Sequence, residues 1–193
     1  MRLKNFLVAA YMALPAIAGS NTTDIAPKLQ TLLAEIDLRY KNTFLNLERV
    51  VSGRPGVKFD DVISMYNRTV AAQGSYLDKH QPTQALPDTT QLVLCQAYHS
   101  LALSGIELNY AFVKHLNILR TTQRLGLESI LNKVYTETGR FSTTVARKAL
   151  PYCYETVHND NVFIYSSIRE AVSVMYLELP GTQRLLQGTQ QLM

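Results

Sequence analysis

Apolar side chains recur at alternating steps of three and four residues along nearly the whole chain, from about residue 24 to residue 179. This spacing places them on one face of an α-helix, whereas a half-buried strand requires a step of two. No stretch of the sequence keeps the two-residue step or joins two apolar runs by a hairpin dipeptide. The pattern therefore predicts an all-α fold in which amphipathic helices bury their apolar faces against one another.

Glycine and proline divide this pattern into five segments. We expect helices over about 24–51, 59–77, 89–120, 125–151 and 151–179, with Asp24 as the N-cap of the first. Short connections make consecutive helices antiparallel, so the prediction is an up-and-down bundle of about five helices in one domain. The third segment is the longest and the most apolar, so it should lie at the centre.

The N-terminus has the pattern of a secretory signal peptide. Arg2 and Lys4 precede an apolar run, and Ala16-Ile17-Ala18 fits the small-x-small cleavage rule. We expect a signal peptide over 1–18, the helical domain over 24–179 and a frayed tail over 180–193. No later stretch is long and apolar enough to span a membrane, so the protein should be secreted and extracellular.

The chain has two cysteines, Cys95 and Cys153. An isolated pair in an oxidising compartment forms one disulfide, with two free buried thiols as the alternative. If the third, fourth and fifth helices alternate in direction, both cysteines lie at the same end of the bundle, where a bridge is feasible.

Two N-glycosylation sequons fit an extracellular surface. They begin at Asn21 and Asn67. Asn21 lies close to the expected cleavage site, so Asn67 is the better candidate.

The polar residues form no catalytic or metal-binding motif. The four histidines lack HExxH spacing, and His99 and His115 lie roughly 20 Å or more apart on one helix by the helical rise. There is no GxSxG and no phosphate-binding glycine loop. The net charge of +4 comes from scattered lysines and arginines, which excludes a nucleic-acid footprint. We expect a protein that is not an enzyme and that uses no metal or cofactor.

Gly105 and Gly139 lie at or beside the apolar seam of two central helices. Glycine in a helix interior costs about 1 kcal/mol relative to alanine, so each should have a structural reason. Close helix packing is the commoner reason, and space for an apolar ligand is the alternative. The ligand hypothesis names nine lining residues: Leu101, Gly105, Leu108, Phe112, Leu131, Val134, Phe141, Ile164 and Ile168. Lys114 or His115 would hold a carboxylate at the mouth.

Two segments carry a family resemblance: FVKHLNILRTTQRLGLESILNKVYTETGRFSTTVARKALP and IYSSIREAVSVM. Together with the Gly126-Leu127 step and the Thr138-Gly139-Arg140-Phe141 element, they resemble the fungal hydrophobic surface binding protein A family, also called the cell wall galactomannoprotein family. The chain departs from that family in its cysteine pair, its many tyrosines and its lack of a Ser/Thr-rich tail.

The resemblance implies a secreted, cell-wall-associated glycoprotein that adsorbs to hydrophobic surfaces or holds fatty acids in a channel between helices. A different class of function is a secreted effector or inhibitor that binds a host or wall protein through an exposed helix face. An enclosed apolar channel would favour the first hypothesis. A filled core with an exposed aromatic patch would favour the second.

Overall fold

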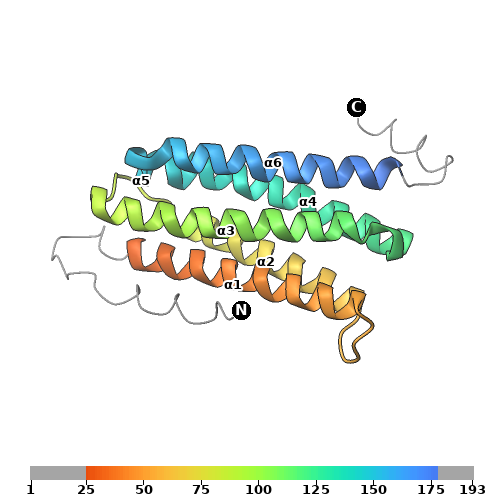
Figure 1. Cartoon of the computed structure of the whole chain (residues 1–193). Coiled ribbons are helices and arrows are strands. Elements are labelled where there is room, and N and C mark those ends of the chain that lie inside the picture. Colours follow the sequence, from red (N-terminus) through yellow and green to blue (C-terminus); the bar gives the residue numbers. More distant parts are fainter. Residues whose placement is uncertain (1–24, 178–193) are drawn as a thin grey trace, which may run out of the picture.

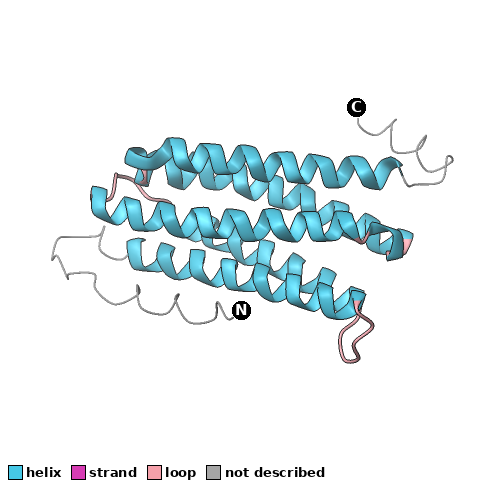
Figure 2. Cartoon of the chain, viewed as in Figure 1, coloured by secondary structure: helices cyan, strands magenta, loops and turns pink. Residues whose placement is uncertain are grey.

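Five long helices run alternately up and down along a common axis (Figure 1) in a computed structural model that describes residues 25–177. They are α1 (Ile25–Val51), α2 (Phe59–Lys79), α3 (Asp88–Lys114), α4 (Thr121–Phe141) and α6 (Tyr154–Leu177). The described residues contain no strand (Figure 2), so the all-α, up-and-down prediction is confirmed. The expected signal peptide, Asp24, Asn21 and the expected tail from residue 180 lie outside the described part of the chain.

The helices form two layers. Helix α3 packs against α1 on one side and α6 on the other, and these three run in the same direction. Helices α2 and α4 pack against each other in the second layer and run the opposite way. The apolar core fills the space between the layers. Helix α3 lies between α1 and α6, in the central position expected for the third helix.

Side chains at the third helical position cap the two helices of the second layer. The Lys58 N–H donates to Asp61 Oδ2 at 2.9 Å before α2, and the Arg120 N–H donates to Gln123 Oε1 at 3.0 Å before α4. These bonds satisfy backbone donors that the helix itself leaves unpaired. Asp60 then accepts from Gln123 Nε2 at 2.8 Å, which ties the two helix starts together.

A disulfide closes one end of the bundle. Cys95 in α3 bonds to Cys153 in the 3-10 turn η3 (Pro151–Cys153), which confirms the predicted pairing. The buried Gln91 supports it: its Nε2 donates to Leu86 O at 2.5 Å, and its Oε1 accepts from the Tyr152 N–H at 2.8 Å. These bonds fix the start of α6 to the start of α3, within one layer.

The chain departs from uninterrupted helix in two places. The third helix ends at Lys114, earlier than expected, and a 3-10 turn η1 (Leu116–Ile118) follows it. The expected fourth helix changes after Phe141 into a π turn η2 (Ser142–Ala146) and a short α5 (Arg147–Ala149). Hydroxyls explain the π turn: Thr143 and Thr144 donate to the carbonyls of Gly139 and Arg140, at 3.0 and 2.6 Å, and compete with the backbone for them.

Helices long and apolar enough to cross a bilayer are absent from residues 25–177. A cluster of three or more possible metal ligands is absent from the same residues.

Candidate functional site in the bundle core

A small cavity lies between the two layers, at the middle of the bundle. Its volume is about 10 Å³, which is room for about one water molecule. Every long helix contributes to its wall. The lining residues are Tyr40, Gln73, Tyr98, Leu101, Gly105, Asn109, Val134, Thr138 and Ile164.

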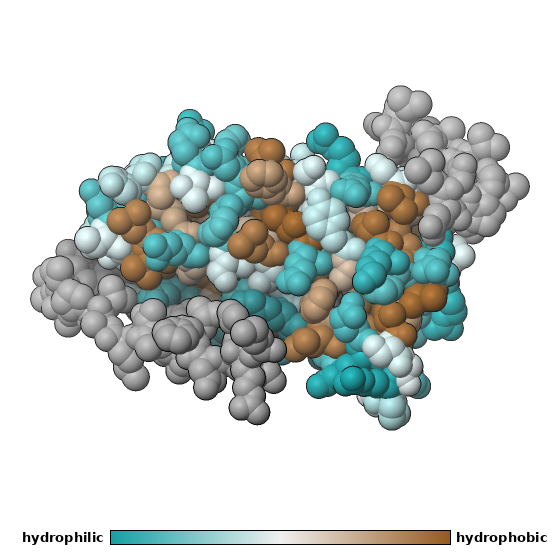
Figure 3. Space-filling model, viewed as in Figure 1, coloured by the Kyte–Doolittle hydropathy of each residue, from teal (hydrophilic) through white to brown (hydrophobic). Residues whose placement is uncertain are grey.

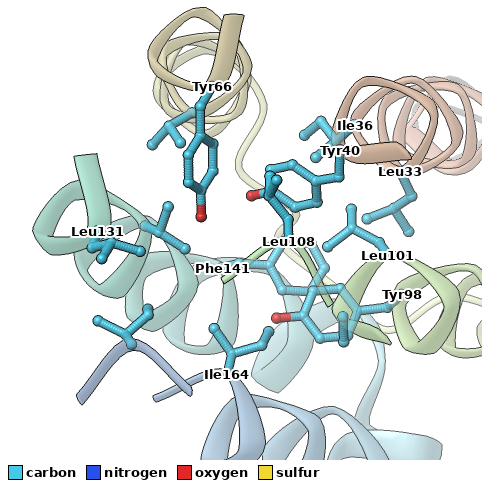
Figure 4. Packing of buried hydrophobic residues seen from close by; sticks show 14 of the residues in the cluster. Leu33, Ile36, Tyr40, Tyr66, Tyr98, Leu101, Leu108, Leu131, Phe141 and Ile164 are labelled. Carbon is cyan, nitrogen blue, oxygen red and sulfur yellow. The ribbon is translucent and has the colours of Figure 1, made fainter. Parts of the chain in front are cut away.

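Aromatic rings and aliphatic side chains pack around this cavity (Figure 4). Tyr66 meets Tyr40 edge to face, with ring centroids 5.7 Å apart, and stacks on Phe112 at 5.8 Å. Tyr98 stacks on Phe141 at 4.5 Å. Such pairs stabilise a core beyond the area that they bury. The rings therefore pack closely around the cavity, and the space left in it is too small for an alkyl chain.

Several hydroxyls point into this closely packed core (Figure 4). The Tyr66 hydroxyl donates to Asn109 Oδ1 at 2.7 Å, and Asn109 Nδ2 donates to Ser167 Oγ at 3.0 Å. The Tyr98 hydroxyl donates to Asn161 Oδ1. These bonds connect α2, α3 and α6 through polar groups in the protein interior.

Three polar groups on the cavity wall have no such partner. Within residues 25–177, the Tyr40 hydroxyl and the side chains of Gln73 and Thr138 form no hydrogen bond, although all three residues are buried. Buried polar groups are normally paired with protein or with ordered water. The three groups are therefore free to bind a polar atom in the cavity.

Burial keeps the tyrosines protonated. It raises the pKa of Tyr40, and it raises the pKa of Tyr66 and Tyr98 well above the usual value. The neighbouring Tyr40 raises both of the latter further, and Asp160 adds to the pKa of Tyr98. Low dielectric in the core disfavours an anion, so each hydroxyl keeps its proton.

The structure divides the nine predicted lining residues into two groups. Leu101, Gly105, Val134 and Ile164 lie on the cavity wall. The other five are buried in the surrounding core: Leu108, Phe112, Leu131, Phe141 and Ile168. Their contact with a ligand stays a prediction.

The two glycines have packing partners. A Cβ on Gly105 would lie 3.1 Å from the Tyr40 ring, and one on Gly139 would lie 3.3 Å from the Tyr165 hydroxyl. Close packing therefore explains both. Lys114 and His115 lie at the end of α3, away from the cavity wall, and His115 Nε2 is 3.5 Å from Glu48 Oε1.

Sequence reasoning missed the polar part of the site. Tyr40, Tyr66, Tyr98 and Thr138 follow the apolar spacing of their helices, and that spacing assigns no role to their hydroxyls. Gln73 and Asn109 were not selected at all. The available signal was the occurrence of hydrogen-bonding side chains on faces that must be buried.

A second hollow lies on the surface between α2 and α4. It has a volume of about 450 Å³ and is open to solvent. Asn67, the preferred glycosylation candidate, lies on its wall, and Asn67 Oδ1 accepts from Lys133 Nζ at 3.1 Å. Glycosylation of Asn67 stays a prediction.

No family model and no curated protein matches the chain. Solved structures do match it. Ligand binding domain 2 of the Penicillium marneffei MP1 protein, complexed with multiple arachidonic acids, superposes with a TM-score of 0.66 at 13% identity, covering 77% of this chain and 94% of that domain. Aspergillus Afmp4p in complex with palmitic acid superposes with a TM-score of 0.56 at 14% identity, covering 78% of this chain and 99% of Afmp4p. At these identities the likeness shows a shared fold.

Proposed function

We propose that this chain is a non-enzymatic lipid-binding protein that holds one fatty-acid-like molecule between its two helical layers. The observation that carries the proposal is the set of unpaired polar groups on Tyr40, Gln73 and Thr138, which lie on the wall of a cavity that is also lined by apolar side chains. A ligand with one polar end and an apolar chain matches this combination. Both solved neighbours were obtained with fatty acids, which supports the same class of ligand.

Binding requires the layers to separate, because the cavity holds about one water molecule. Each methylene buried would contribute about 0.8 kcal/mol, so an alkyl chain can offset the cost of opening. The disulfide joins α3 to the start of α6, which lie in the same layer, so it leaves this motion free. The apparent affinity is the affinity of the open state multiplied by the fraction of molecules that are open.

Displacement of a neutral fluorescent lipid tests the proposal. Val134→Phe adds bulk to the cavity wall and should weaken binding at least tenfold, while Val162→Phe, at an exposed position of α6, should leave it unchanged. Circular dichroism checks that both variants remain helical. The proposal fails if the wild-type chain binds no lipid, or if the folded Val134→Phe variant binds as well as the wild type.

An exposed apolar stripe supports a second candidate function. Leu92, Leu103 and Tyr110 follow one outer face of α3, and Phe163 of α6 is 63% exposed. His99 Nδ1 lies 2.8 Å from Asp160 Oδ1, which places Leu103 and Phe163, one turn further along, on neighbouring positions. Apolar side chains gather on this α1–α3–α6 face in Figure 3.

This stripe would serve adsorption to a hydrophobic surface or contact with a host or wall protein. The filled core and the exposed Phe163 are the combination that favours such contact. Leu103→Glu with Phe163→Glu should abolish retention on a hydrophobic resin and leave lipid affinity intact. Unchanged retention would remove this candidate.

Secretion belongs to the same proposal, with membership in the fungal hydrophobic surface binding protein A family. The N-terminal pattern of residues 1–18 and the Cys95–Cys153 disulfide support it. N-terminal sequencing of protein from culture medium should give a chain that begins at residue 19 or 20. An intact N-terminus on protein recovered from inside the cell would contradict it.

A further inference from the structure

The cavity wall favours one kind of polar group. We infer that the ligand of this site carries an uncharged head group that both donates and accepts hydrogen bonds, such as an alcohol or a protonated carboxylic acid, and not a carboxylate. The inference rests on the proposed lipid-binding function and adds the chemistry of the head group.

The first argument is the missing counter-charge. None of the nine residues on the cavity wall is charged, and residues 25–177 bury no lysine, arginine or histidine. A carboxylate moved from water into an apolar interior needs a cation or a full set of donors. The cavity wall supplies no cation.

The second argument is the state of the donors. Tyr98, which lines the cavity, already donates to Asn161 Oδ1, so its hydroxyl offers lone pairs to anything else in the cavity. Lone pairs repel a carboxylate and accept from a hydroxyl. The free groups on Tyr40, Gln73 and Thr138 each donate and also accept. The set as a whole matches a head group that does both.

The third argument is the charge around the site. On α6, Asp160 raises the pKa of Tyr98, and its Oδ1 lies 2.8 Å from His99 Nδ1 of α3. Its second oxygen, Oδ2, is buried without a partner among the described residues. On α1, Asp37 accepts from Lys41 Nζ at 2.7 Å and from Ser104 Oγ at 2.5 Å.

The second layer also carries acidic side chains near the cavity wall. Next to Gln73, a Cβ on Gly74 would lie 3.1 Å from the Glu137 carboxyl of α4. Arg140 is held by two carboxylates, Glu137 Oε2 at 2.8 Å and Asp78 Oδ1 at 2.5 Å. Tyr165, another titratable neighbour, also raises the pKa of Tyr98. The basic groups of Lys41, His99 and Arg140 are thus held by carboxylates of the protein, and none of them is left to pair with a carboxylate in the cavity.

A pair of soluble probes tests the inference: decanoic acid and decanol, each titrated into the full chain by displacement of a neutral fluorescent lipid. We expect decanol to bind equally at about pH 5 and about pH 8. Decanoic acid should weaken about tenfold for each pH unit above the pKa of its carboxyl group, because only its protonated form binds.

Each outcome separates the two proposals. Equal binding of decanoic acid at both pH values overturns the head-group inference and leaves lipid binding intact. A parallel loss of decanol with pH also overturns it, because the dependence then belongs to the protein. Failure of both probes at both pH values removes the lipid-binding function, and the head-group inference falls with it.

Matched variants locate the effect. Tyr40→Phe removes a free hydroxyl from the cavity and should weaken decanol about tenfold. Tyr176→Phe removes a hydroxyl that donates to Glu128 Oε1 at 2.6 Å on the outside of the core, and it should leave decanol affinity unchanged. Equal affinities of the two variants would overturn the assignment of the head group to this cavity.

Discussion

Tyr40 and Tyr66 are two buried tyrosines in ring contact, yet their hydroxyls have different surroundings. Tyr66→Phe leaves Asn109 Oδ1 buried without its donor, which should lower the free energy of unfolding by about 1–3 kcal/mol. Tyr40→Phe breaks no protein hydrogen bond within residues 25–177, so its effect should be smaller by at least about 1 kcal/mol. Urea unfolding of both variants measures the difference, and equal losses would contradict the hydrogen-bond assignment.

Two helix glycines make a second matched pair. A Cβ on Gly126 would meet Ile63 Cγ2 at 3.6 Å, an ordinary contact, so Gly126→Ala should stabilise the protein by about 0.5–1 kcal/mol. A Cβ on Gly105 would lie 3.1 Å from the buried Tyr40 ring, which Tyr66 holds edge to face. Gly105→Ala should therefore lose that gain and destabilise. Thermal unfolding decides, and an increase in Tm for Gly105→Ala would show that the Tyr40 ring moves freely.

At the scale of the elements, apolar spacing predicted the helices well. The second helix begins at Phe59 as expected. Its start is marked twice in the sequence, by the first apolar residue of the seam and by Asp60 and Asp61 in the first turn. The third helix ended too late in the prediction, because apolar Leu116 and Leu119 continue the seam after the backbone has become a 3-10 turn. The π turn could not be predicted, since it depends on which backbone carbonyls accept from the hydroxyls of Thr143 and Thr144.

The disulfide is the element-scale tie between α3 and the start of α6. Cys95→Ala with Cys153→Ala removes the cross-link, which should lower the free energy of unfolding by about 2–5 kcal/mol. Helical content should persist, because Gln91 still bonds to Leu86 and to Tyr152. Urea unfolding with and without reductant checks this: reductant should destabilise the wild type and leave the double variant unchanged. Equal stability of the disulfide-bonded wild type and the double variant would contradict the role of the bridge.

At the scale of the whole molecule, the candidate site was only partly predictable. Leu101, Val134 and Ile164 lie on the cavity wall, because seam residues of neighbouring helices must meet at the centre of the bundle, and their contact with a ligand stays a prediction. The same seam pattern describes a filled core and an open channel equally well. The difference depends on rings such as Phe141, which stacks on Tyr98 from another helix. Pairing across helices is set by the relative shift of the two layers, and spacing along one helix carries no information about that shift.

Those rings also determine how the whole molecule responds to alkali. Burial raises the pKa of Tyr40, Tyr66 and Tyr98 in the folded state, while the unfolded chain keeps the ordinary value near 10. The stabilisation is fully present below pH 10, and it is lost as the pH rises above 10 toward the folded-state values. There the unfolded state binds fewer protons than the folded one, so each tyrosine lowers the free energy of unfolding by about 1.4 kcal/mol per pH unit.

We therefore expect cooperative unfolding above pH 10, with ionisation of the core tyrosines coinciding with the loss of helix. Tyrosinate absorbance and far-ultraviolet circular dichroism, followed on the same samples, measure the two events. Tyr40→Phe removes one of the three groups and should make the fall of stability with pH less steep by one tyrosine's share. If every tyrosine of the chain ionised while the helical signal stayed constant, the core would be open to water. The description of a closely packed core between the layers would then be wrong.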